Sequence, residues 1–281
     1  MTSDIINALH IPSKGMVYDL ASGWWRKMPG AEPHPVLEVL TYRSPRGQQI
    51  EQDISLLAAG NDVGYGFVSE LVMGTTHTGT HIDALCHVTC GPDNSWHGGA
   101  SADHHLGDFG ARDQDASRLD PIVTRGVLLD IPRLFGVEAL EPAQPIGSSE
   151  LDQACRAQGV DVRKDDAVLV RTGQMRYWPE RDAMAAVDGA GVSVDGAKWL
   201  SGRHVQVVGA DTVCLEVQPS GIAGNPQPVH LHLIRDHGIP IMEWVCCEEL
   251  ARDEVFEFLF IALPLSIRGA TGSMLRPIAV I

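Results

Sequence analysis

The chain has 281 residues, of which 44% are hydrophobic and 20% charged, a composition typical of a globular protein rather than of a disordered or membrane-spanning one. Its formal net charge of -15 argues against nucleic acid and against an anionic membrane surface as partners. The sequence contains no internal repeat and no Gly/Ser linker, so we expect a single domain over residues 1–281.

Targeting signals are not evident in the sequence. Residues 1–15 lack a basic start followed by an apolar run, and no stretch approaches the length of a membrane span. The six cysteines are scattered and form no CxxC pair, so we expect them to be reduced. These features predict a cytoplasmic protein.

The first part of the chain is expected to be rich in short strands. Strands are predicted at residues 16–20, 36–42 and 65–73, with a loop at 28–35 and a turn near 44–47. The segment 54–60 is ambiguous. Residues 88–110 are rich in Gly, Asp, Asn and His without a hydrophobic period, which predicts either a wall over a site or a surface excursion.

The second part alternates strands and helices. Strands are predicted at residues 126–131, 167–171, 205–208, 239–245 and 256–263, with an edge strand at 277–281. Helices are predicted at 150–158, 195–201 and 228–237, with a helical turn at 248–250. Ser149 with Asp152 suggests a capping box, and Gly159 a helix end. Strands outnumber helices, which favours a mixed α/β (α+β) fold.

The most informative stretch is residues 77–87, which carries three histidines and an aspartate as H-x3-H-x-D-x3-H. Neutral imidazole and carboxylate are standard ligands of divalent metals. A straight strand would spread these four residues over roughly 33 Å, and an ideal helix would point Asp83 and His87 away from His77 and His81. The chain must therefore bend, which Gly79 allows. We interpret the stretch as a loop that leaves a strand, folds around an ion and runs into a helix.

A metal held by His77, His81 and Asp83 would form an open site of the catalytic kind. His87 could bind a second ion or carry protons beside the first.

A second group of candidates lies late in the chain. Glu243 interrupts an apolar strand, where a carboxylate must be paired, liganded or neutral. With His230 or His232 it could complete a two-metal centre bridged by Asp83.

These patterns resemble the cyclase-like metal-dependent amidohydrolases, a family that includes bacterial kynurenine formamidase and isatin hydrolase. The similarity extends from residues 77–87 to several shorter motifs, at residues 18–20, 28–29, 169–173, 209–212 and 230–243. The resemblance implies a swivelling β/β/α fold, a homodimer or homotetramer, and one or two Zn²⁺ or Mn²⁺ ions. Leu85 stands where formamidase-like members usually carry a proline.

The resemblance also assigns roles by position. It implies first-metal ligands at His77, His81 and Asp83, and a second-metal ligand or catalytic proton shuttle at His87. The distal pair corresponds to His230 and Glu243, and the presence of Glu243 favours two metals.

We therefore predict a metal-dependent hydrolase that cleaves a C–N bond of an amide, lactam or cyclic imide-like small molecule with metal-activated water. His87, or His230 if His87 is a ligand, is predicted to move the proton. The candidates for stacking on an aromatic substrate are Trp25, Trp96, Tyr177 and Trp178.

Two other functions fit part of the pattern. His81, Asp83 and His230 imitate the facial triad of a non-haem metal oxygenase, although no basic residue follows His230 at about ten positions to hold a 2-oxo acid. A non-catalytic metal-binding protein of the same fold is the other alternative.

Overall fold

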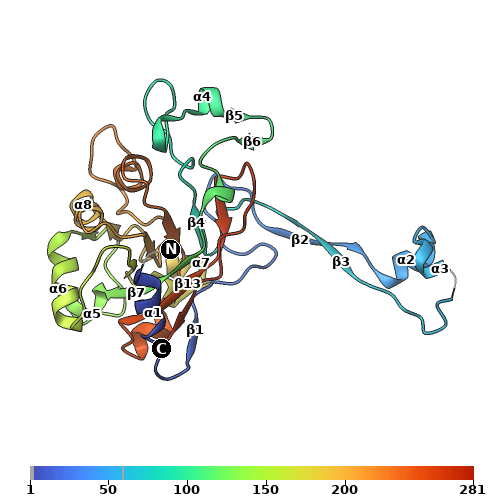
Figure 1. Ribbon diagram of the computed structural model, residues 1–281, viewed down its shortest axis with the longest axis horizontal. Helices are drawn as coiled ribbons and strands as arrows, with labels where there is room; N and C mark the ends of the chain where they lie inside the picture. Colours follow the sequence, from blue (N-terminus) through green and yellow to red (C-terminus); the bar gives the residue numbers. More distant parts are fainter. Residues whose placement is uncertain (1–2, 59) are drawn as a thin grey trace.

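A mixed sheet forms the centre of the molecule in the computed structural model, which describes residues 3–58 and 60–281 (Figure 1). Within these residues nine strands join in this sheet. In spatial order they are β1 (Val17–Asp19), β15 (Ile278–Val280), β13 (Glu257–Ala262), β7 (Ile122–Asp130), β9 (Ala167–Arg171), β11 (Val207–Ala210), β12 (Ile241–Glu243), β4 (His81–Asp83) and β14 (Gly272–Met274).

The middle of this sheet is parallel and buried on both faces. β7, β9, β11 and β12 pair in parallel, whereas the outer strands pair antiparallel. Every residue of β9, β11 and β12 is buried, which explains why these segments are apolar runs without alternation. The predicted edge position of the last strand is wrong, because β15 lies between β13 and β1.

Helices cover the sheet, and alternate strand residues enter two cores. Val127 and Val168 pack with Leu151 and Leu200 of two helices, whereas Leu169 faces the opposite core with Phe258. The helical segments of the body are α1 (Ser3–Leu9), α5 (Ile131–Phe135), α6 (Ser148–Gln158), η3 (Gln174–Tyr177), α7 (Arg181–Ala185), α8 (Val194–Gly202), α9 (Pro228–His230), η4 (Leu231–Asp236) and α10 (Glu248–Arg252). Among the described residues, no helix combines the length and apolar character needed to cross a membrane.

The start of α6 differs from the prediction. The residue before the helix is Gly147, and its N–H donates to the Glu150 carboxylate at 2.8 Å, so the expected Ser149–Asp152 capping box is wrong. The expected end at Gly159 is confirmed, with the left-handed backbone typical of a helix C-terminus (φ 68°).

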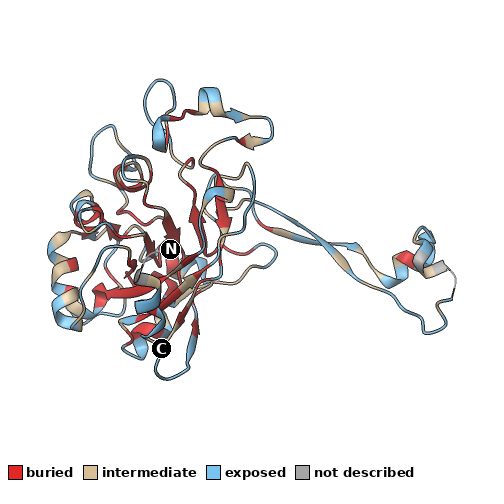
Figure 2. Cartoon of the chain, viewed as in Figure 1, coloured by how far each residue is buried: buried red, intermediate tan, exposed pale blue. Residues whose placement is uncertain are grey.

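A long two-stranded arm projects from the body, as Figures 1 and 2 show. It consists of β2 (Glu38–Arg43) paired antiparallel with β3 (Ser69–Met73), with α2 (Pro45–Glu51) and α3 (Ser55–Ala58) toward its far end. The predicted turn near 44–47 is wrong: the Ser44 hydroxyl accepts from Gly47 N–H and begins α2.

The segment after His87 forms a separate excursion near the top of Figure 1. Its elements are η1 (His97–Gly99), α4 (Ala102–His105), β5 (Leu106–Gly107), β6 (Gly110–Ala111) and η2 (Ala116–Arg118). Trp96 anchors the excursion in a small buried cluster with Ala84 and Cys86. A separate two-stranded parallel sheet is formed by β8 (Pro145–Ile146) and β10 (Gly191–Val192).

Candidate metal centre

The bend predicted in the histidine-rich stretch occurs between β3 and β4. Gly79 has a left-handed backbone (φ 55°), and a Cβ atom there would lie 2.6 Å from the Ser22 hydroxyl oxygen. His81 and Asp83 then occupy alternate positions of β4 and share one face. The expected run into a helix is wrong, because β4 is a strand that is followed by a turn.

The pairing of β4 with β12 brings the two distant halves of the site together. His81 lies directly opposite Glu243 in the antiparallel register. On the other side, Gly272 of β14 pairs with Asp83. A Cβ atom on Gly272 would lie 2.5 Å from the His77 ring, so the absence of a side chain there makes room for His77.

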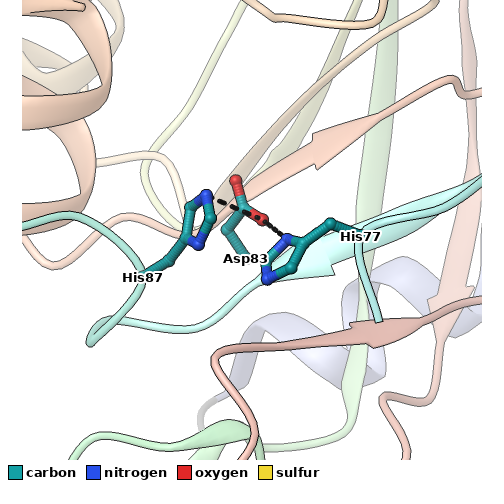
Figure 3. A group of neighbouring side chains, drawn as sticks. All are labelled: His77, Asp83 and His87. Carbon is teal, nitrogen blue, oxygen red and sulfur yellow. Dashed lines mark hydrogen bonds and ion pairs between the residues drawn. The ribbon is translucent and has the colours of Figure 1, made fainter. Parts of the chain in front are cut away.

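Asp83 lies at the centre of the candidate ligands. Its Oδ1 is 2.8 Å from His77 Nδ1, 3.7 Å from His81 Nε2 and 3.9 Å from His87 Nε2. Figure 3 shows its carboxylate between the His77 and His87 rings. Its Oδ2 is 4.0 Å from His230 Nε2 and is a buried oxygen without a hydrogen-bond partner among the described residues.

The distal residues complete this arrangement. Glu243 places Oε2 3.4 Å from His81 Nε2 and Oε1 3.2 Å from His230 Nε2. His230 therefore points into the site, whereas His232 contacts the Ser201 hydroxyl at 2.9 Å, away from Asp83.

Five of the six predicted residues form two overlapping groups with ligand atoms within 4.8 Å of one another, whereas His230 belongs to a third group with Cys214 and Glu216. One group contains His77, Asp83 and His87, and the other contains His81, Asp83 and Glu243. The structure thus groups His81 with Glu243, whereas the sequence placed it with His77 at a first metal. Asp83 belongs to both groups, the position required of a bridging carboxylate.

Hydrogen bonds fix which ring nitrogens face the centre. His81 Nδ1 contacts the Gly79 carbonyl oxygen at 2.7 Å, so its Nε2 is directed toward Asp83 and Glu243. His230 Nδ1 contacts Glu216 Oε1 at 2.6 Å, which directs its Nε2 in the same way. Such outer partners orient imidazole ligands in metal sites.

Charge and burial together suit the centre to a cation. Burial alone would raise the pKa of Asp83, but the adjacent His87, His77 and His81 hold that pKa well below its usual range. Burial alone would lower the pKa of the His230 imidazole. Its hydrogen bonds with the Glu216 and Glu243 carboxylates outweigh this effect, so that the pKa is raised above its usual value. Buried ionised carboxylates need a compensating cation, and the unpartnered Asp83 Oδ2 is an open ligand position. The residues therefore fit a divalent metal.

His87 differs from the other histidines. Burial lowers the pKa of its imidazole to about 4, so its ring is neutral at pH 7. Its side chain is 24% exposed, compared with 6% for His77 and His81 and 3% for His230.

Two residues that hold the site were not identified from the sequence. Glu216 is buried within an apolar run, the same signal that singled out Glu243, so it could have been found. Thr271, whose hydroxyl contacts His77 Nε2 at 2.9 Å, has no recognisable sequence signal.

A cavity of about 690 Å³ opens onto the centre. It is lined by five of the predicted residues, His77, His81, His87, His230 and Glu243. None of the predicted stacking aromatics lines it, and the aromatic wall is Trp244. Of the 88–110 segment, which was predicted to form either a wall or a surface excursion, Val88 alone lines the cavity. Trp178 packs behind it, with ring centroids 5.2 Å apart.

Solved structures with similar folds match nearly the whole chain. A structure described as a novel cyclase is 25% identical, with a TM-score of 0.84 over 100% of this chain and 94% of its own. Isatin hydrolase A from Ralstonia solanacearum is 19% identical, with a TM-score of 0.67 over 95% of this chain and 92% of its own. A potential metal-dependent hydrolase with cyclase activity is 17% identical, with a TM-score of 0.56 over 94% and 98% of the two chains. The predicted mixed α/β fold of the cyclase-like type is confirmed.

The comparison with curated proteins found no match. A family model described as "Putative cyclase" matches residues 18–217, a range that includes Asp83 and Glu216 but ends before His230 and Glu243. Because this range is more than half of the chain, the protein belongs to this cyclase family.

Proposed function

We propose that the chain is a metal-dependent hydrolase that cleaves a C–N bond of an amide, lactam or cyclic imide-like small molecule. The observation that carries the proposal is the buried Asp83 carboxylate, which both ligand groups share and whose Oδ2 has no hydrogen-bond partner among the described residues. Supporting comparisons are the isatin hydrolases, one of them bound to the product analogue thioisatinate, and a structure described as a potential metal-dependent hydrolase.

Zn²⁺ and Mn²⁺ both suit the imidazole and carboxylate donors of this centre. The residues that would hold one or two such ions are His77, His81, Asp83, His230 and Glu243. When bound, the metal supplies a water of lowered pKa and polarises the substrate carbonyl.

His87 is the residue that carries the proton between the water and the leaving nitrogen. Both ring nitrogens of His77 and both of His230 have hydrogen-bond partners. His87 makes no such bond among the described residues and lines the cavity, so its ring is free to accept and return a proton.

The cavity suits a cyclic or aromatic substrate body. Trp244, Met184, Val213 and Val88 provide apolar walls beside the histidines. A substrate packed against these walls has its carbonyl carbon within reach of the centre, and water is displaced from the apolar surfaces.

The proposal predicts that activity depends on metal. We expect purified protein loaded with Zn²⁺ or Mn²⁺ to hydrolyse members of a panel of N-formyl arylamines, lactams and cyclic imides, and to lose this activity on chelation. Asp83→Ala should lose both the metal, measured by mass spectrometry of the bound element, and the turnover. The exposed Asp120→Ala variant is the control and should retain both.

The outcomes separate the alternatives. Turnover that persists in chelator would contradict the hydrolase proposal. Oxygen uptake with Fe(II) would favour the oxygenase, and a tightly held, inert ion without turnover would favour a non-catalytic metal protein.

The functional unit is proposed to be a homodimer or homotetramer. The arm formed by β2 and β3 supports this, because a two-stranded ribbon that is exposed on both faces is marginally stable in water unless something packs against it.

A further inference from the structure

The cavity that opens onto the metal centre contains one strongly cationic side chain. Among the described residues that line it, Arg181 is the only lysine or arginine. Arg181 begins α7 and is exposed, so its guanidinium lies where the cavity reaches solvent. The same cavity is also lined by His230 and Glu243 of the metal centre.

The guanidinium is held in place but is not neutralised. Its Nη2 donates to the Met28 carbonyl oxygen at 2.9 Å, which connects α7 to the loop that forms another wall of the cavity. No carboxylate of the described residues lies within 4 Å of it. By contrast Arg176, one short helix earlier, pairs with Glu138 at 2.8 Å.

Eleven of the seventeen arginines form an ion pair among the described residues, and Arg181 is not one of them although acidic residues are abundant. The sequence has 36 Asp and Glu against 21 Lys and Arg. Besides Glu243, two carboxylates line the same cavity, those of Glu32 and Asp188. The Asp188 carboxylate already accepts a hydrogen bond from the Gln174 amide at 2.9 Å. Four of the five N–H donors of Arg181 thus remain available to a molecule in the cavity.

We propose that Arg181 forms an anion subsite that binds a carboxylate, or a similar planar oxyanion, on the substrate while the scissile carbonyl lies at the Asp83 centre. The planar guanidinium matches a carboxylate through two parallel hydrogen bonds. The apolar surfaces of Trp244 and Met184, which line the same cavity, contact the substrate body. This inference rests on the proposed hydrolase function and narrows its substrates to anionic amides or lactams.

The test uses a matched pair of probes, 4-formamidobenzoate and its neutral methyl ester. The wild type should prefer the acid. Arg181→Gln should lower kcat/KM for the acid by at least about five-fold and up to roughly a hundred-fold, mainly through KM, and change the value for the ester less than about two-fold. Arg181→Lys should fall between the two, because lysine keeps the charge without the planar fork. The control Arg176→Gln should leave both probes unchanged.

A binding measurement separates this inference from the hydrolase proposal. Calorimetric titration of metal-loaded protein with 4-aminobenzoate should show binding that weakens by the same factor in Arg181→Gln, and its methyl ester should show no such dependence. Arginine-dependent binding without turnover of either probe would support the subsite and count against the hydrolase. Equal affinity of wild type and Arg181→Gln for 4-aminobenzoate, a preference for the ester, or no binding by the wild type would overturn the subsite.

Discussion

Glu216 determines the orientation of His230 although it does not face the cavity. Its Oε1 accepts from the His230 backbone N–H at 3.0 Å and contacts the ring Nδ1 at 2.6 Å, so the His230 ring is fixed from two directions. Glu216 is 1% exposed, which strengthens both contacts. These contacts favour a role for Glu216 as a positioning residue at the candidate metal centre.

Glu216→Gln tests this role. The amide is nearly isosteric but is a weaker acceptor, so we expect the affinity for Zn²⁺ to fall about 10- to 100-fold with little change in the circular dichroism spectrum. Competition with a chromophoric chelator measures the affinity. Glu249→Gln, on the exposed side of α10, is the matched control. An unchanged affinity in Glu216→Gln would show that His230 is oriented without this carboxylate.

His87→Asn tests the proton-carrying role of His87. If His87 moves the proton, the variant should bind as much metal as the wild type while kcat falls by roughly 10²- to 10⁴-fold. Metal content and turnover are measured on the same preparation. Loss of the metal together with the activity would instead make His87 a ligand, in the group that it forms with His77 and Asp83.

At the scale of elements, features set by the local sequence could be predicted, whereas features set by long-range strand pairing could not. The buried strand at 167–171 and the end of α6 at Gly159 follow from local composition and were expected. The placement of His81 opposite Glu243 depends on the pairing of β4 with β12, which are more than 150 residues apart in the sequence. No local pattern encodes such a register, so the sequence identified these candidate ligands without showing how they group.

The same limit explains the errors at other elements. The strand at 277–281 is apolar and terminal, which is typical of an edge, but β1 from the other end of the chain covers it. Ser44 and Pro45 are equally suited to a turn and to a helix start, and here the helix forms.

Asp211 connects the ends of two central strands through hydrogen bonds. These bonds give a structural role to the short motifs at residues 169–173 and 209–212. Its Oδ1 accepts from the Thr172 backbone N–H and hydroxyl at 2.7 and 2.8 Å, and its Oδ2 accepts from Gly173 N–H at 2.7 Å. Thr172 follows β9 and Asp211 follows β11, so one buried carboxylate holds both strand ends.

Asp211→Asn should destabilise the fold by about 1–3 kcal/mol, because the amide nitrogen cannot accept and one buried N–H loses its partner. Urea unfolding measures this, with the exposed Asp120→Asn as control. A free energy of unfolding equal to that of the wild type would contradict the role of Asp211 as a tie between strands.

The contribution of Asp211 to the free energy of unfolding should also depend on pH. Burial raises the pKa of Asp211 from 3.8 to about 6. Because the folded chain then binds this proton more tightly than the unfolded chain, the contribution of Asp211 to stability increases as the pH falls from 7 to 5. The difference in free energy of unfolding between wild type and Asp211→Asn should grow by about 1 kcal/mol over this range. A constant difference would show that the pKa of Asp211 is not raised.

At the scale of the whole molecule, the arm exposes apolar side chains that packing within the body does not account for. Among the described residues, eleven of the twenty-four large hydrophobic side chains that are exposed lie between Val36 and Met73. They occupy both faces of the ribbon, as the exposed Leu40 and Leu71 on one face and Val39 and Val72 on the other show. Exposed apolar surface of this extent is typical of a protein–protein interface. β3 leads directly into His77, so a partner on the arm would also stabilise the entrance to the site.

We therefore expect the chain to elute at twice its mass or more in size-exclusion chromatography with light scattering. The double variant Leu40→Lys and Val72→Lys places a charge on each face of the ribbon, at residues that are 41% and 60% exposed. This variant should elute as a single chain. The control pair Phe135→Lys and Val137→Lys changes equally apolar side chains on the body, 50% and 45% exposed, and should keep the wild-type mass. A wild type that elutes as a single chain, or an arm variant that keeps the wild-type mass, would contradict assembly through the arm. Because the arm continues into the loop that carries His77, a dissociated variant is also expected to bind Zn²⁺ more weakly than the control pair.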